Sequence, residues 1–293
     1  MNEEDKLRLV PQESVEDLTK RLERQRRAEN LQRESGFENS VAPFKIGCVR
    51  YLNAVPLARG IEDQIIFEVP SKLAQMLQKN ELDTALVSIV EALSKDEYDI
   101  LDGIAIACLG EVKSVLLAHR RPLEEVDVVY LDSASLTSVS LLKVLLAEKG
   151  LRPRYEMLND YSEAEKYDYV LLIGDEALNY VYYKKPYDLW DLGAAWYELT
   201  HLPFVYAVWA IRKDVKNVER LIRILRDAKD FGLDTLDSII SNRTEYDYDF
   251  RKDYLTWHIH YHLGSDERKG ITRFIELIEK HRLFKVYPPN YVS

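Results

Sequence analysis

From Phe44 onward, short apolar runs alternate along the chain with amphipathic segments. The apolar runs predict buried strands, because most of them are too short for helices; they are FKIGCV, IIFEV, DTALV, IAIACL, VKSVLLA, VDVVYLD, YVLLIG and FVYAVWAIR. The amphipathic segments predict helices, and the one that ends at Gly150 has a glycine C-cap signal. This alternation is typical of an α/β fold built on mostly parallel sheet.

A late apolar strand followed by a long helical tail predicts that the chain crosses to a second lobe and then returns. We place residues 44–117 and 212–293 in lobe I and residues 118–211 in lobe II. Ligands of open α/β sheets bind beyond the carboxyl ends of the strands, and binding pockets often lie between domains. We therefore expect a two-lobed fold with a ligand cleft between the lobes.

Residues 1–43 differ in texture from the rest of the chain. The stretch 14–34 favours helix and is highly charged, with one narrow apolar stripe formed by Val15, Leu18 and Leu22. This pattern predicts a charged helical extension that lies on the surface or is partly ordered. The alternative is a helix for dimerisation, in which case the protein would be a homodimer, or a helix that binds another partner.

The charge balance limits the partners of the protein. Lys plus Arg number 40 against 50 Asp plus Glu, a net charge of −10, which argues against nucleic acid or an anionic membrane as a partner. No apolar run reaches 18 residues, and the first forty residues lack the apolar core of a signal peptide. Cys48 and Cys108 form no CxxC pair, so we expect a cytoplasmic protein without a membrane segment.

Small polar residues stand at four junctions where a predicted strand leads into a predicted helix. A helix N-terminus presents free N–H groups and partial positive charge, and it can therefore bind a carboxylate without a basic side chain. Taken singly, each residue is an ordinary N-cap; four junctions that face one cleft predict a site for a small anion. The candidate binding residues are Asn53, Ser88, Ser135, Thr137, Ser138, Gly174 and Asp175.

Two further features argue for a structural role when taken alone. Ser114 lies within an apolar run and is interpreted as a satisfied core hydroxyl. The WHIHYH segment is interpreted as helix, in which only His258 and His262 share a face. No cysteine or HExxH pattern joins them, so we expect no metal site there. The chain also has no GxSxG elbow, P-loop or GxGxxG fingerprint, which argues against nucleophilic hydrolases and nucleotide enzymes.

Six runs, in order, resemble the chorismate dehydratase family of the futalosine route to menaquinone. They are IGCVRYLNAVPL, LDTALVSIVEAL, GEVKSVLL, TSVSLLKVLL, LLIGDEAL and DLGAAWYELTHLPFVYAVWA. Together they extend over most of the chain after Pro43. Two positions depart from the family pattern: Leu136 stands where relatives often have Arg, and His201 stands where Gly is common.

The resemblance implies a type 2 periplasmic-binding-protein architecture and a cytoplasmic lyase that removes water from chorismate. The product would be 3-[(1-carboxyvinyl)oxy]benzoate, formed without a metal or organic cofactor. In this interpretation Asn53 and Ser114 become the candidate catalytic residues, and Tyr51 joins the substrate-binding set. Because Glu91, Asp175 and Glu176 are not clear bases, we expect the enolpyruvyl carboxylate of the substrate to take the C3 proton.

Two alternatives remain open at this point. The first is a cytoplasmic sensor or binding protein for small anions on the same fold. The second is the sister enzyme of the pathway, which acts on a futalosine derivative.

Overall fold

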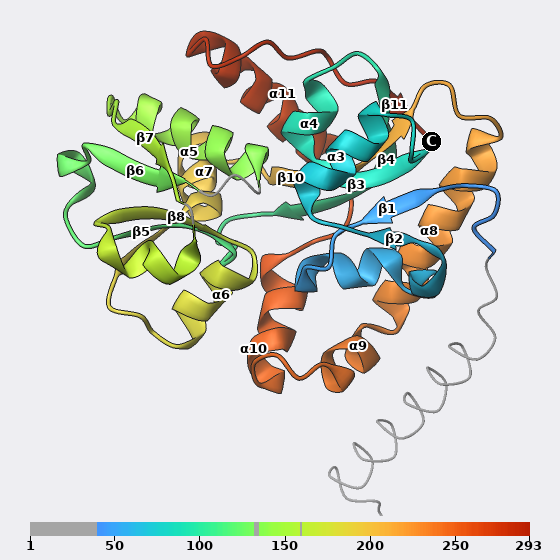
Figure 1. The fold of residues 1–293 in the computed structure, drawn as a ribbon, viewed down its shortest axis with the longest axis horizontal. Coiled ribbons are helices and arrows are strands. Elements are labelled where there is room, and N and C mark those ends of the chain that lie inside the picture. The colour runs from blue at the N-terminus through green and yellow to red at the C-terminus, as the bar shows by residue number, and fades with distance from the viewer. Residues whose placement is uncertain (1–39, 132–134, 159) are drawn as a thin grey trace, which may run out of the picture. The chain divides into compact units, whose positions relative to one another are not determined.

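The protein is described by a computed structural model, in which residues 40–131, 135–158 and 160–293 are placed. The predicted helix at 14–34, and with it the dimerisation alternative, lies outside these residues. Residues 39–293 form one compact unit that contains two β-sheets (Figure 1). Among the described residues, no helix is both long and apolar enough to cross a bilayer.

The first sheet has six strands in the order β11-β4-β10-β3-β1-β2. Strands β1, β2 and β3 are parallel neighbours, and β10 runs antiparallel to both β3 and β4. The strands are β1 (Ile46–Cys48), β2 (Ile66–Phe67), β3 (Thr84–Ser88), β4 (Tyr98–Cys108), β10 (Phe204–Arg212) and β11 (Tyr291–Val292).

The second sheet has five strands in the order β7-β6-β8-β5-β9. Here β6 is parallel to β7 and β8, and β5 is antiparallel to β8 and β9. The strands are β5 (Val115–His119), β6 (Val128–Leu131), β7 (Arg154–Met157), β8 (Tyr169–Ile173) and β9 (Asp188–Asp191).

Both sheets are therefore mixed, whereas the sequence predicts mostly parallel strands. The antiparallel members are the strands next to the crossings, β5 on the way out and β10 on the way back. A strand that arrives from the other lobe enters its sheet in the direction opposite to that of the neighbouring strands, which are connected to one another by helices of the same lobe. An apolar run has no direction of its own, so this feature could not be seen in the sequence.

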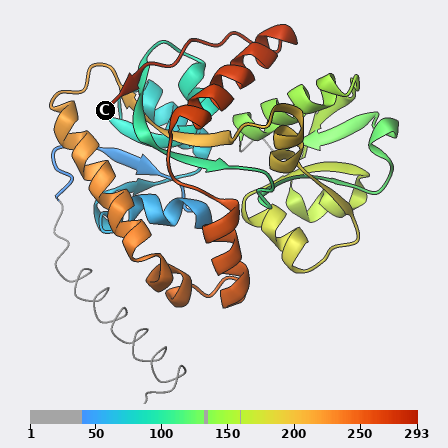
Figure 2. The ribbon, with the colours of Figure 1, turned by 180° about the vertical axis from the view of Figure 1, so that it is seen from behind.

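Helices flank the two sheets. In the six-stranded lobe, α8 packs on η2 and β4 and lies in the foreground of Figure 2. The helices of this lobe are η2 (Leu52–Ala58), η3 (Glu62–Gln64), α3 (Pro70–Gln78), α4 (Ile89–Leu93), α8 (Val218–Asp234), α9 (Leu236–Asn242), α10 (Tyr248–Asp253), η6 (Tyr254–His258) and α11 (Ser265–Lys280). Those of the other lobe are η4 (Leu123–Glu125), α5 (Leu136–Glu148), η5 (Tyr161–Lys166), α6 (Asp175–Tyr182) and α7 (Leu192–Thr200).

The chain changes sheet between β4 and β5 and again between β9 and β10. These crossings span residues 109–114 and 192–203. The predicted lobe boundaries after residues 117 and 211 fall inside β5 and β10 instead. The difference arises because a strand belongs to the sheet with which it hydrogen-bonds, and its apolar run does not reveal that partner.

A half-buried carboxylate holds the two crossings together. The Asp191 carboxylate accepts hydrogen bonds from the backbone N–H groups of Val112 and Lys113 on one crossing, at 3.1 and 2.8 Å. On the other crossing it accepts from Gly193 and Ala194, at 2.9 and 3.0 Å. A Cβ at Gly193 would lie 2.5 Å from the Gly110 carbonyl oxygen, so glycine permits this close approach.

Two predicted boundaries of local structure are wrong. The sequence predicts an extension over residues 1–43, but Val41 is buried and its N–H donates to Gln64 Oε1 at 3.1 Å, so residues 41–43 belong to the core unit. The helix predicted through WHIHYH ends at His258, and Ile259 is extended. His260 then forms an antiparallel bridge with Ala107, with N···O distances of 2.9 and 3.0 Å.

Candidate functional site

A pocket lies in the cleft and is lined by both lobes. The empty space within it, with the open solvent at its mouth included, is about 670 Å³. We call it the cleft pocket. Its lining residues are Val49, Tyr51, Asn53, Pro70, Leu86, Val87, Ser88, Ile106, Val112, Ser114, Val115, Ser135, Ser138, Ile173, Gly174, Tyr206, Ala207 and Ile259.

The structure brings seven of the nine predicted site residues to this pocket. Six of them come from the four predicted junctions of strand and helix, and Ser114 comes from the crossing between β4 and β5. The seven residues are Tyr51, Asn53, Ser88, Ser114, Ser135, Ser138 and Gly174.

A polar cluster at the pocket wall joins Asn53 and Ser114 through a third residue, Tyr254. Asn53 Nδ2 donates to the Tyr254 hydroxyl at 3.1 Å. Burial raises the pKa of Tyr254, while hydrogen bonds from Ser114 and Asn53 act in the opposite direction. Asn53 Oδ1 is buried and has no hydrogen-bond partner among the described residues, so this amide keeps polar capacity for a ligand.

The caps predicted at α4 and α5 are confirmed. The Ser88 hydroxyl accepts from Glu91 N at 3.2 Å at the start of α4. At the start of α5, the Ser135 hydroxyl accepts from Ser138 N at 3.3 Å and lies 3.0 Å from the Ser138 hydroxyl. Both helices therefore begin at the pocket with a hydroxyl-bearing turn, which favours anionic groups of a ligand.

Tyr51 and Gly174 close the pocket from opposite lobes. Gly174 has φ of 59° and ψ of −133°, and it precedes α6. This conformation favours glycine. A Cβ at Gly174 would lie 3.4 Å from the Tyr51 ring, so the bare backbone leaves the ring room at the pocket wall.

Two predicted residues have other positions. Thr137 is fully buried, and its Oγ1 accepts from Val90 N at 3.2 Å, so it ties α5 of one lobe to α4 of the other. Asp175 is the first residue of α6, and its carbonyl oxygen accepts from the Tyr246 hydroxyl at 3.2 Å. Burial and the nearby Glu245 raise the pKa of Asp175. Neither side chain lines the cleft pocket.

The lining of the cleft pocket has no formal charge. Among its described residues none is Asp, Glu, His, Lys or Arg. Glu91 lies in an adjacent hollow, where its Oε1 accepts from Gln78 Nε2 at 2.9 Å. Tyr206 and Cys108 are buried beside each other, and burial raises the pKa of Cys108 to about 12. No described lining residue is thus a base suited to neutral pH.

The sequence does not point to Tyr206 and Ile259, which line the pocket, or to Tyr254, which is not a lining residue but bonds to Asn53. Tyr254 follows Asn53 by two hundred positions and lies in a π-helix. Short π-helical turns are frequent at functional sites, but no residue pattern in the sequence predicts this one.

Comparison with known proteins identifies relatives of this chain. A family model described as menaquinone biosynthesis matches residues 44–280. A chorismate dehydratase from Thermus thermophilus is 34% identical over 259 residues, which cover 80% of this chain and 95% of the relative.

Solved structures show the fold. A protein from Archaeoglobus fulgidus superposes with a TM-score of 0.67 at 18% identity, covering 82% of this chain and 98% of that one. The periplasmic aliphatic sulphonate binding protein from Escherichia coli gives a TM-score of 0.54 at 12% identity, covering 85% and 93%. The predicted periplasmic-binding-protein-like α/β fold is confirmed.

Proposed function

The chain belongs to the menaquinone biosynthesis family, and on that premise we propose that it is a chorismate dehydratase. It would convert chorismate to 3-[(1-carboxyvinyl)oxy]benzoate and water in the cytoplasm. The observation that supports this best is the lining of the cleft pocket, which offers hydroxyls, an amide and helix N-termini to a small dicarboxylate.

The elimination demands accurate positioning more than strong chemistry, because aromatisation of the ring drives it. The C3–H bond breaks, its electron pair forms the C3=C4 double bond, and the C4 hydroxyl leaves and takes a proton to become water. This balance requires no metal or organic cofactor. The enzyme would act as a carbon–oxygen lyase.

The uncharged lining bears on the identity of the base. Since no described residue of the lining is a carboxylate, imidazole or amine, we infer that the substrate supplies the base. The enolpyruvyl carboxylate is attached through the ether oxygen at C3 and can fold back toward the C3 proton. Asn53 and Ser114 would hold this conformer, with Tyr254 orienting the Asn53 amide.

The direct test is to incubate the purified full chain with chorismate and to separate the products by chromatography. Formation of the enolpyruvyl benzoate supports the proposal. Tight binding of unchanged chorismate would instead favour the sensor alternative. Absence of both, with turnover of a futalosine derivative, would favour the sister enzyme.

Asn53→Ala tests the assignment within the site. We expect turnover to fall at least tenfold, which corresponds to about 1.4 kcal/mol of barrier. The matched control is Asn242→Ala, because Asn242 is exposed at the end of α9, outside the cleft pocket, and its amide donates to the Ser238 hydroxyl at 3.2 Å. Equal activity of the two variants would contradict the role of Asn53.

A chorismate analogue that lacks the enolpyruvyl carboxylate tests the origin of the base. We expect it to bind to the wild-type protein without being dehydrated. Normal turnover of this analogue would show that a protein group removes the proton.

A further inference from the structure

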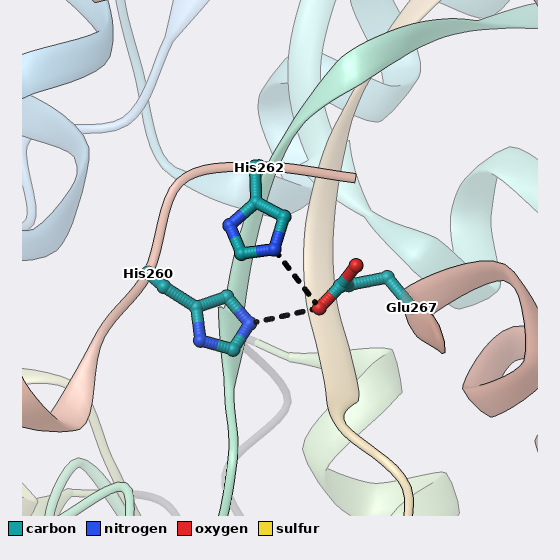
Figure 3. A group of neighbouring side chains, drawn as sticks. All are labelled: His260, His262 and Glu267. Carbon is teal, nitrogen blue, oxygen red and sulfur yellow. Dashed lines mark ion pairs between the residues drawn. The ribbon is translucent and has the colours of Figure 1, made fainter. Parts of the chain in front are cut away.

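Three potential metal ligands meet on the side of the six-stranded lobe, outside the cleft pocket. They are His260 and His262, on the extended segment after η6, and Glu267, in the first turn of α11 (Figure 3). One ligand atom from each residue lies within 4.8 Å of the other two. Nothing in the proposed dehydration uses this group.

The backbone explains why these two imidazoles share a face. Because the segment is extended and bridged to Ala107, residues i and i+2 point the same way. The rings of His260 and His262 lie 4.8 Å apart between centroids. In the helix that the sequence predicts here, only His258 and His262 could act together, and no metal site is expected.

Two of the three spacings match the edge of a tetrahedral metal site. Nε2 of His260 and Nε2 of His262 each lie 3.4 Å from Glu267 Oε1. Zinc bonds of roughly 2.0–2.1 Å at tetrahedral angles place neighbouring ligand atoms about 3.3–3.5 Å apart. The same 3.4 Å exceeds the normal range of about 2.7–3.2 Å for a hydrogen bond. The two imidazoles therefore converge on one oxygen without forming good hydrogen bonds to it.

The hydrogen bonding of the ligand residues also suits metal binding. His260 Nε2 is buried and has no hydrogen-bond partner among the described residues. The other oxygen of Glu267, Oε2, accepts from Gly264 N at 2.8 Å and thereby fixes the carboxylate. Ligand carboxylates in metal sites are commonly held in this way.

Access and charge favour an ion at this position. The His262 side chain is 61% exposed, whereas that of Glu267 is 5% exposed, so the group opens to solvent on one side only. The nearby Arg268 is paired with Asp102. A divalent ion would compensate the buried carboxylate, and water could complete the coordination.

We propose that His260, His262 and Glu267 bind a divalent transition-metal ion of the Zn²⁺ type. Imidazole nitrogens with one carboxylate suit such ions better than Ca²⁺ or Mg²⁺, which prefer oxygen ligands. The ion would fasten the segment 259–263 to the start of α11. Since Ile259 lines the cleft pocket, the ion would also steady that wall.

The test uses the full chain without a polyhistidine tag, stripped of metal by chelation and then titrated with Zn²⁺ in a calorimeter. Co²⁺ serves as a second probe, because its visible absorption reports coordination. We expect one equivalent of either ion per chain, and a melting temperature that rises when Zn²⁺ is added. Absence of stoichiometric binding would overturn the proposal and leave the cluster as a helix cap with two adjacent imidazoles.

Variants locate the site. His262→Ala removes an exposed ligand, and Glu267→Gln keeps an oxygen for Gly264 N while weakening the metal ligand. We expect each to raise the dissociation constant at least tenfold and to abolish the thermal shift. The control His119→Ala removes an imidazole on β5, whose Nδ1 lies 2.9 Å from the Arg121 carbonyl oxygen, and should bind as the wild type does. Equal affinity in all three variants would place the ion elsewhere and contradict the proposal.

Discussion

Replacing Tyr254 by Phe tests whether this buried hydroxyl positions the proposed catalytic pair. Tyr254 is 1% exposed, and its hydroxyl accepts from Asn53 Nδ2 at 3.1 Å. Without that hydroxyl the amide loses its partner in a buried setting, which costs about 1–3 kcal/mol of folding free energy. Each kcal/mol lowers the melting temperature by about 2–4 °C in a domain of this size. Because Asn53 also loses its orientation, we expect kcat for chorismate to fall at least tenfold, or about 1.4 kcal/mol.

Tyr261→Phe is the matched control for this experiment. Tyr261 is also buried, but its hydroxyl has no hydrogen-bond partner among the described residues. Removing an unpartnered polar group should leave the melting temperature unchanged or higher, and kcat unchanged. Steady-state kinetics and thermal melts of both variants decide the matter. Equal losses of kcat in the two variants, or full activity of Tyr254→Phe, would refute the positioning role.

Three further predictions concern the extension, a strained helix end and the base. Deleting residues 1–38 should leave chorismate turnover and the melting temperature unchanged. Deleting residues 1–43 should lower the melting temperature, because burial of Val41 contributes roughly 1.5–3 kcal/mol to the free energy of unfolding. Equal melting temperatures of the two truncated proteins would contradict this. His201 caps α7 with φ of 56°, so His201→Gly should stabilise the protein by about 0.5–1 kcal/mol in chemical denaturation, whereas His201→Ala should not. Glu91→Gln should lower kcat less than tenfold, and a thousandfold loss with intact chorismate binding would identify Glu91 as the base.

The elements that were predictable from the sequence are those with a strong local pattern. The apolar runs from Phe44 onward form strands, and the serines at the starts of α4 and α5 cap those helices as expected. Such caps depend on three or four consecutive residues, and their geometry is fixed locally. The convergence of these caps at one pocket follows from the α/β architecture, because the strands that precede them end at the cleft.

The features that were not predictable depend on partners distant in sequence. The direction of β10 is set by pairing with β3 and β4, and the apolar run of β10 has no information on direction. Likewise, Tyr254 meets Asn53 only because the chain returns from the second lobe. The extended backbone after His258 is held by the bridge to Ala107, so the helical periodicity assumed there was overridden by tertiary contact.

The most direct test of the proposed dehydration is to follow two labels in one substrate. Chorismate with deuterium at C3 and ¹⁸O in the C4 hydroxyl would be incubated with the protein, and the organic product would be analysed by mass spectrometry. We predict 3-[(1-carboxyvinyl)oxy]benzoate that has lost both labels, with the ¹⁸O recovered in water. A product that retains either label, or unchanged chorismate, would contradict dehydration by this protein.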